Sequence, residues 1–192
     1  MLRDRGYRVF ATARKPEDVQ RLASEGLEAL QLDLDDSNSI NAAVDTILER
    51  TGGQIYALFN NGAYGQPGAV EDLTRDVLRA QFETNLFGWL ELTNRLIPIM
   101  RKQGEGRIVQ NSSVLGLVAL PFRGAYNSSK FAIEGLSDQD ILDLAAVVLA
   151  GAGFEVSTAG SGEQALDLLA GERAELDGRL EALSAAAVLY RP

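Results

Sequence analysis

The sequence predicts an α/β fold built on a doubly wound, mostly parallel sheet. Two observations lead to this prediction. Short apolar runs typical of buried strands alternate with amphipathic helices along residues 7–59, and such alternation favours parallel strands joined by right-handed crossovers. The chain has 192 residues, which is enough for one domain of this class with a substantial core.

The first elements follow from local signals. Residues 1–6 are expected to end a helix, with Gly6 in the left-handed position that commonly follows a helix end. An apolar strand is predicted over residues 7–13. A helix then runs from Pro16 to about Glu25, because proline is favoured in the first helical turn. A second strand is predicted over residues 27–32.

The alternation continues after the second strand. Ser37 or Ser39 is expected to cap a helix that runs to Arg50 with apolar residues at helical spacing. A third strand is predicted over residues 55–59, after a pair of glycines that breaks the helix. A long helix is then expected over residues 75–100.

Residues 106–130 carry the strongest chemical signal. A short apolar strand ends just before Ser113, and Tyr126 and Lys130 are spaced i, i+4, which places them on one face of a helix. A fixed cation beside a tyrosine favours the phenolate form, so Tyr126 is a candidate general acid or base. Ser113 would hold a carbonyl or hydroxyl group in place. Each of these features taken alone is ordinary turn or helix composition.

Together, Ser113, Tyr126 and Lys130 resemble the active-site signature of the short-chain dehydrogenases/reductases, and the resemblance covers about residues 2–138. It implies a Rossmann-like fold and an NAD(P)-dependent oxidoreductase acting on a carbonyl or alcohol. In this family the serine orients the substrate, the tyrosine transfers the proton, and the lysine assists the tyrosine and holds the nicotinamide ribose. Asn85 matches the family's Asn-x-x-Gly motif and would join the proton relay to the lysine.

The same resemblance assigns a cofactor site at the strand ends. Arg14 and Lys15 follow the first strand, where a basic residue implies a preference for NADPH over NADH. The motif that begins at Asn60 is Asn-Asn-Gly-Ala, which resembles the family's Asn-Asn-Ala-Gly with its last two residues exchanged. The expected cofactor contacts are Arg14, Lys15, Asp33, Leu34, Asn60, Gly62, Tyr126 and Lys130.

Residues 140–172 resemble a different family, the receiver domains of response regulators, whose flavodoxin-like fold is also doubly wound. The chain is therefore interpreted as a dehydrogenase-like portion over 1–138 and a receiver-like helix-strand-helix tail over 139–192, and both portions are expected to contribute to one chimeric sheet. The distribution of charge supports a boundary between residues 138 and 139, since the net charge is −3 over residues 1–138 and −6 over the much shorter stretch 139–192. The acidic pair and phosphoacceptor of receivers have no match, so no phosphorylation switch is expected.

The dehydrogenase resemblance starts after the strand and glycine-rich turn that bind the cofactor pyrophosphate in this family. We therefore expect a sheet truncated at its N-terminal side, with a slot between the strands at 7–13 and 55–59. Residues 185–190 or a second chain are candidates to fill it. Two functions stay open: an NADP(H)-dependent oxidoreductase, or a non-catalytic chimeric or engineered fold that keeps the catalytic residues without a working cofactor site.

Composition excludes several other functions. The sequence contains neither cysteine nor histidine, which excludes disulfides, Ser-His-Asp triads and nearly every zinc site, so no metal is expected. A net charge of −9 disfavours nucleic acid as a partner. Without a membrane-spanning stretch or a signal peptide, the expected location is the cytoplasm, with a small-molecule substrate as partner. The helices at 75–100 and 122–136 match those that pair in the family's dimers, so a homodimer is an open expectation.

Overall fold

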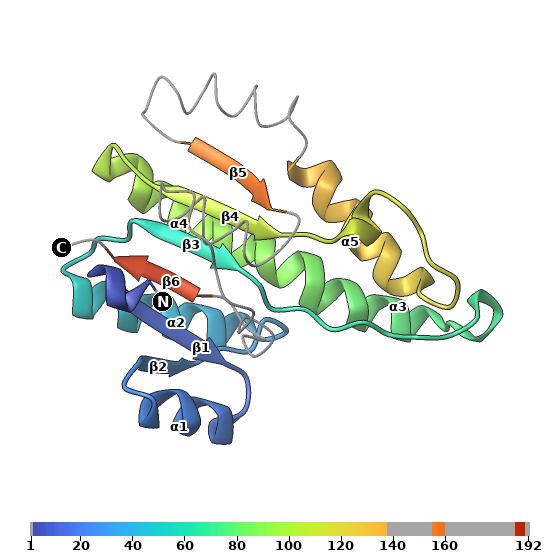
Figure 1. The fold of residues 1–192 in the computed structure, drawn as a ribbon, viewed down its shortest axis with the longest axis horizontal. Helices are drawn as coiled ribbons and strands as arrows, with labels where there is room; N and C mark the ends of the chain where they lie inside the picture. Colours follow the sequence, from blue (N-terminus) through green and yellow to red (C-terminus); the bar gives the residue numbers. More distant parts are fainter. Residues whose placement is uncertain (1, 138–154, 160–186, 191–192) are drawn as a thin grey trace.

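Strands that are far apart in the sequence form one sheet in the order β2-β1-β6-β3-β4-β5. The computed structural model describes residues 2–137, 155–159 and 187–190. The strands are β1 (Arg8–Ala13), β2 (Glu28–Gln31), β3 (Ala57–Asn60), β4 (Arg107–Asn111), β5 (Glu155–Ala159) and β6 (Ala187–Tyr190). Every pairing is parallel except the two that β6 makes, which confirms a mostly parallel sheet (Figure 1).

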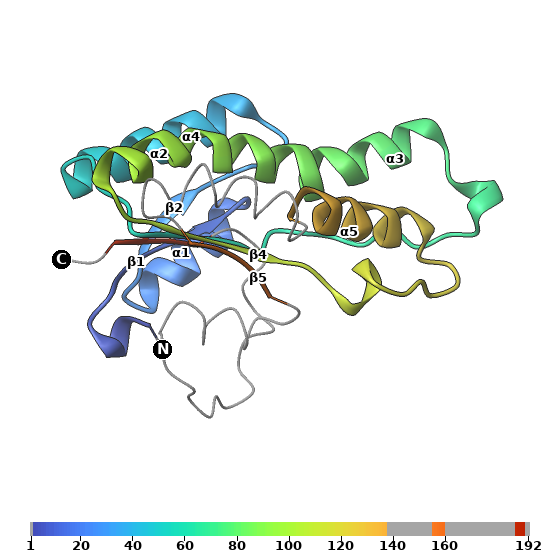
Figure 2. The same cartoon turned by 90° about the horizontal axis from the view of Figure 1, so that it is seen from above.

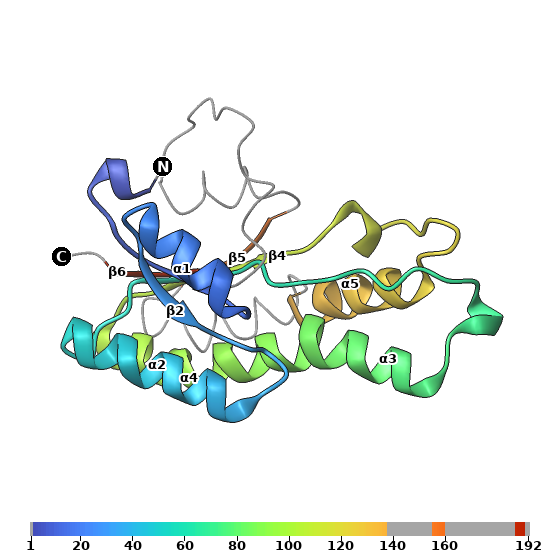
Figure 3. The same cartoon turned by 90° about the horizontal axis from the view of Figure 1, so that it is seen from below.

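The helices lie on both faces of this sheet. Figures 2 and 3 show α2 and α4 on one face and α1 on the other. The main core joins the first of these faces to the sheet, because the apolar sides of α2 and α4 pack on Phe10 and Leu58, which are both 0% exposed. The helices are α1 (Pro16–Ser24), α2 (Ser37–Thr51), α3 (Arg75–Phe82), α4 (Gly88–Gln103) and α5 (Gly124–Ser137).

The ends of these elements follow from local chemistry. Gly6 has φ 88°, which confirms its left-handed position after the short 3₁₀ turn at Arg3–Arg5. The expected cap of α2 was wrong. Asp36 is the N-cap and its carboxylate accepts a hydrogen bond from Asn38 N at 2.9 Å. Ser39 Oγ instead accepts from Asp33 N at 2.9 Å and fixes the end of the β2–α2 connection.

The long helix predicted over residues 75–100 contains an irregular turn. A π-helical turn at Glu83–Phe87 joins α3 to α4, and α4 continues through Pro98 to Gln103. A π turn inserts one extra residue per turn into a helix and is frequent at functional sites. Here it contains Asn85, which is 0% exposed.

The slot between β1 and β3 is filled by β6. Its register pairs Ala187 with both Ala11 and Phe59, and Tyr190 with Arg8. Because β6 is antiparallel to both neighbours, its first residue lies at the edge where β1 and β3 end. Within the predicted range of 185–190, the described residues 187–190 therefore form a strand that fills the slot. Within the receiver-like tail predicted over 139–192, the described residues are those of β6 and of β5, which pairs in parallel with β4; the predicted helices of the tail lie outside the described residues.

Candidate active site

The predicted catalytic groups come from two adjoining segments of the chain. Tyr126 and Lys130 lie in the first half of α5, and Ser113 follows the end of β4. Lys130 is only 2% exposed, and its Nζ donates a hydrogen bond to the carbonyl oxygen of Asn111 at 2.8 Å. This bond joins α5 to the end of β4, so it also holds the tyrosine helix beside the serine segment.

Two aromatic rings surround the lysine ammonium. Lys130 Nζ lies 4.6 Å from the centroid of the Trp89 ring and 5.7 Å from that of Tyr126. Both distances are within the range in which a cation is attracted to a ring face. Burial opposes the charge and lowers the pKa of Lys130 to about 8, while the nearby Glu134 carboxylate works in the opposite direction. At neutral pH the ammonium form therefore dominates.

Ser113 begins a short turn beside this lysine. Its backbone is extended, and its Oγ accepts a hydrogen bond from Leu115 N at 3.1 Å at the start of the 3₁₀ turn Val114–Gly116. A serine hydroxyl that accepts one bond still has its own hydrogen to donate. The side chain is half-buried, so this donor is available to a bound molecule.

Two buried amides hold the loop that follows β3. Asn85 Nδ2 donates to Tyr64 O at 2.9 Å and to Ser129 Oγ at 3.0 Å, and its Oδ1 accepts from Tyr64 N at 3.1 Å. Gln81 Nε2 donates to Tyr64 O at 2.7 Å and its Oε1 accepts from Gln66 N at 2.8 Å. The loop backbone is thus tied to both α5 and the helix that contains the π turn.

The loop comes very close to the tyrosine. A Cβ atom added at Gly65 would lie 3.3 Å from Tyr126 Cδ2 and 3.4 Å from Arg123 Nη1. Contacts this short leave little space for a side chain, so glycine allows the backbone to lie against the Tyr126 ring. The loop therefore helps to fix the phenol.

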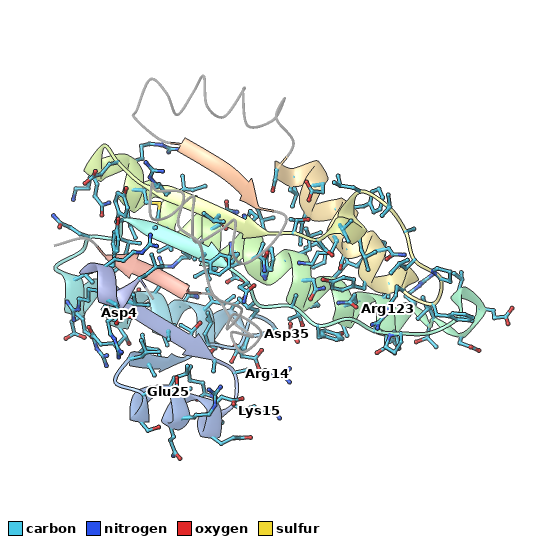
Figure 4. The ribbon with its side chains drawn as sticks, viewed as in Figure 1. Asp4, Arg14, Lys15, Glu25, Asp35 and Arg123 are labelled. Carbon is cyan, nitrogen blue, oxygen red and sulfur yellow. The ribbon has the colours of Figure 1, made fainter. Side chains whose placement is uncertain are left out.

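A pocket of about 430 Å³ lies where β1, β2 and β3 end. Two exposed cations, Arg14 and Lys15, lie at its β1 side (Figure 4). Neither forms an ion pair with another of the described residues. Burial and the Asp35 carboxylate raise the pKa of Tyr64 in the same pocket, and Arg14 partly offsets this. The pocket is lined by Arg14, Lys15, Asp18, Leu32, Asp33, Leu34, Asp35, Gly62, Ala63, Tyr64 and Thr84.

Comparison with known proteins decides the family. A profile of the short chain dehydrogenase family matches residues 1–175. The chain belongs to this family. The match runs through residues 140–172, for which the sequence suggested receiver domains, and the comparisons give that second resemblance no support.

Relatives of this short-chain dehydrogenase include several named oxidoreductases. An uncharacterized oxidoreductase, YbbO of Escherichia coli, is 43% identical over 137 residues, which are 71% of this chain and 51% of YbbO. A 3-ketodihydrosphingosine reductase of Bacteroides thetaiotaomicron is 34% identical over 145 residues, 75% of this chain and 52% of that protein. The chain therefore spans about half the length of these curated relatives.

Solved structures give the same fold. A short-chain dehydrogenase from Streptomyces avermitilis superposes with a TM-score of 0.69 at 33% identity, covering 79% of this chain and 55% of that one. The NADP-bound structure of ElxO also has a TM-score of 0.69, at 24% identity, covering 86% of this chain and 69% of ElxO. At that identity, the likeness to ElxO shows the fold alone.

The short-chain dehydrogenase brings most of its predicted cofactor contacts into one pocket. Arg14, Lys15, Asp33, Leu34 and Gly62 all line it. Asn60 does not.

Asn60 is 0% exposed and holds neighbouring elements together instead. Its Nδ2 donates to Thr93 Oγ1 at 3.0 Å and to Gln110 Oε1 at 2.8 Å. Asn85, predicted to act in a relay to Lys130, has its amide occupied by Tyr64 and Ser129. Direct roles for these two side chains at the cofactor and in proton transfer stay predictions.

Two residues of the short-chain dehydrogenase site were missed by sequence reasoning. One is Trp89, whose ring faces the lysine ammonium and whose Nε1 donates to Gly62 O at 2.5 Å. Gln81 was not singled out. Its position four residues before Asn85 is the only signal that places both amides on one helix face.

Residues 2–137, 155–159 and 187–190 contain no group of acidic side chains arranged to hold a metal ion. None of the helices described is long and apolar enough to cross a membrane.

Proposed function

We propose that this protein is an NADP(H)-dependent oxidoreductase that interconverts a carbonyl compound and the corresponding alcohol. The observation that carries the proposal is the environment of Lys130, whose buried ammonium lies next to the Tyr126 ring and is held by the carbonyl of Asn111. Burying the charge of a residue that is only 2% exposed costs free energy. Charged groups buried at such a cost are common at functional sites, and stabilising a phenolate is a function that this ammonium can serve.

The proposed reaction uses three side chains of this chain. In the reductive direction, the Tyr126 hydroxyl donates its proton to the carbonyl oxygen as that oxygen becomes an alcohol. The phenolate left behind is stabilised by the Lys130 ammonium. The Ser113 hydroxyl donates a hydrogen bond to the same oxygen and orients it. NADPH, when bound, supplies the hydride that the carbonyl carbon accepts.

The pocket at the strand ends fits the adenosine end of this cofactor. Arg14 and Lys15 are cations without ion-pair partners among the described residues, and a phosphate group on the ribose is a suitable partner for them. Leu32 and Leu34 offer an apolar wall for a flat base. Three aspartates also line the pocket, and their negative charges would repel a phosphate. Binding of the phosphate therefore depends on its contact with Arg14 and Lys15.

A homodimer is part of this proposal. Phe87 and Leu90 are 48% and 41% exposed on the helix that pairs in the family's usual dimers. Pairing two copies would remove these side chains from water. Size-exclusion chromatography with light scattering distinguishes a dimer from a monomer directly.

The test of the proposed function is consumption of NADPH in the presence of a panel of aldehydes and ketones. We expect Tyr126→Phe to lower kcat/KM by about a hundredfold or more, the usual effect of removing a general acid. Ser113→Ala should lower it by about tenfold. Tyr7→Phe is the matched control, because Tyr7 precedes β1 at the end of that strand opposite Arg14. Equal activity of Tyr126→Phe and Tyr7→Phe would contradict the proposal and favour the non-catalytic alternative.

A further inference from the structure

Large apolar side chains are exposed on one part of the surface beside the proposed catalytic groups. We call this surface the apolar rim. Each of its members is more than half exposed to water, at 54% to 79% of the side chain's possible area. The rim consists of Val70, Val114, Leu117, Val118, Leu120 and Phe122.

Close contacts join the two segments that form the apolar rim. Gly68 N donates to Phe122 O at 3.0 Å, and a Cβ added at Gly124 would lie 3.6 Å from the Val70 side chain. Figures 1 and 2 show the connections after β3 and after β4 running to the same end of the molecule, past the start of α5. The exposed side chains therefore belong to one surface.

The apolar rim is built into the same segment as the catalytic groups. That segment starts at Ser113 and reaches Tyr126, and residues 112–122 contain no charged side chain. Arg123 is the first charge after them (Figure 4). A molecule whose reacting carbon lies between Ser113 and Tyr126 would extend over a surface that offers mainly hydrocarbon contacts.

The rim is held in a defined shape. Asn127, which is 7% exposed, donates from Nδ2 to Leu120 O at 3.0 Å and from its backbone N to Arg123 O at 2.7 Å. Phe122 has φ 58°, a left-handed conformation that a bulky residue rarely adopts. Such backbone strain persists only where the surrounding structure enforces it, and it is commonly found at functional sites.

We propose that the apolar rim binds the hydrocarbon body of the substrate, so that the substrate is a large apolar carbonyl compound or alcohol rather than a small polar one. This inference rests on the proposed function, since it names the substrate class of the same site. Exposed apolar patches of this kind mark ligand or interaction sites in soluble proteins. A substrate is favoured as the occupant because the patch is continuous with the reacting groups.

The test compares ketones that differ only in length: 2-butanone, 2-hexanone, 2-octanone and 2-decanone, with NADPH as the reductant. Burial of one methylene changes a binding constant by up to about fourfold. We expect kcat/KM to rise by about two- to fourfold per added methylene. Leu117→Ser should reduce that rise, because Leu117 is 70% exposed in the rim. Tyr7→Ser, which removes a half-buried aromatic side chain just before β1, at the end of that strand opposite Arg14, should leave the rise unchanged.

A second readout keeps this test separate from the proposed function. The fluorescence of 1-anilinonaphthalene-8-sulfonate reports binding at exposed apolar surfaces, and 2-decanone should displace it from the wild type but less effectively from Leu117→Ser. Turnover that does not depend on ketone length would overturn the substrate class while leaving the oxidoreductase intact. If no ketone is turned over, the proposed function fails. In that case, displacement of the dye by 2-decanone would still support the apolar rim as a binding surface. If 2-decanone did not displace the dye, the proposed role of the apolar rim would be overturned.

Discussion

The ammonium of Lys130 lies 4.6 Å from the centre of the Trp89 ring, at a point where both side chains are 2% exposed. The tryptophan partly replaces the water that the buried charge has lost. Its indole nitrogen also donates to the carbonyl of Gly62 in the loop after β3. One side chain therefore connects the electrostatics of the proposed catalytic lysine with the wall of the pocket at the strand ends, which Gly62 lines.

Replacing the tryptophan should make the lysine easier to deprotonate. A cation–π contact at a site removed from water contributes about 1 to 2 kcal/mol, so Trp89→Leu should lower the pKa of Lys130 further below 8 by about one unit. The alkaline limit of kcat/KM for ketone reduction should move to lower pH by the same amount. Trp89→Phe keeps a ring and should move it less. Identical pH profiles for the wild type and Trp89→Leu would show that the ring has no electrostatic role.

The lysine also predicts how stability changes with pH. Its folded pKa is about 8, below the ordinary 10.5, so between these pH values the unfolded chain holds a proton that the folded chain has released. The unfolding free energy should therefore rise with pH across this window, by on the order of 3 kcal/mol. Urea unfolding of Lys130→Met at several pH values should lack this rise. At pH 7 the wild type carries the cost of burying the Lys130 charge, so Lys130→Met should be the more stable of the two. This difference in unfolding free energy should shrink towards pH 10.5. A difference that stays constant with pH would refute the lowered pKa of Lys130.

Gly88 is expected to tolerate no side chain. A Cβ at this position would lie 2.2 Å from the backbone carbonyl oxygen of Leu34, a residue that lines the pocket at the strand ends. Gly88→Ala should lower the unfolding free energy by about 2 kcal/mol, as overpacking commonly does. Gly135→Ala is the control, because a Cβ there meets nothing within 4 Å and alanine suits a helix better. Thermal melts of both variants should move in opposite directions.

Two substitutions of Phe122, the strained residue of the apolar rim, distinguish an effect on stability from an effect on substrate binding. Phe122→Ala and Phe122→Gly remove the same apolar surface, but only glycine adopts φ 58° without strain. The glycine variant should therefore be about 1 kcal/mol more stable than the alanine variant in urea unfolding. Both should lose activity towards 2-decanone to the same extent. A larger loss in one of them would mean that the backbone, rather than the ring, determines substrate binding.

The sequence was sufficient for the parts of this fold that local patterns determine. The strand and helix order over residues 7–111 and the left-handed Gly6 follow from apolar periodicity and turn chemistry, whereas residues 185–190 were only one of two candidates for the slot. The N-cap of α2 was missed because aspartate and serine are equally good caps and stand next to each other in the sequence.

The parts that depend on distant contacts were not predictable. The π turn around Asn85 keeps helical periodicity on both sides, so nothing local distinguishes it from a regular helix. The antiparallel direction of β6 depends on its neighbours in the sheet. The face that Trp89 presents to Lys130 is likewise set by the packing of α4 against α5, and its sequence context indicates only a core residue.

The most direct test of the account is a calorimetric titration of the protein with NADPH, repeated with NADH and on Arg14→Ala. Loss of one exposed charge-assisted contact costs about 1 kcal/mol. We expect micromolar binding of NADPH that Arg14→Ala weakens by about fivefold, with NADH affected by less than twofold. Absence of heat with NADPH at millimolar concentration would contradict the account and leave Ser113, Tyr126 and Lys130 without a cofactor to serve.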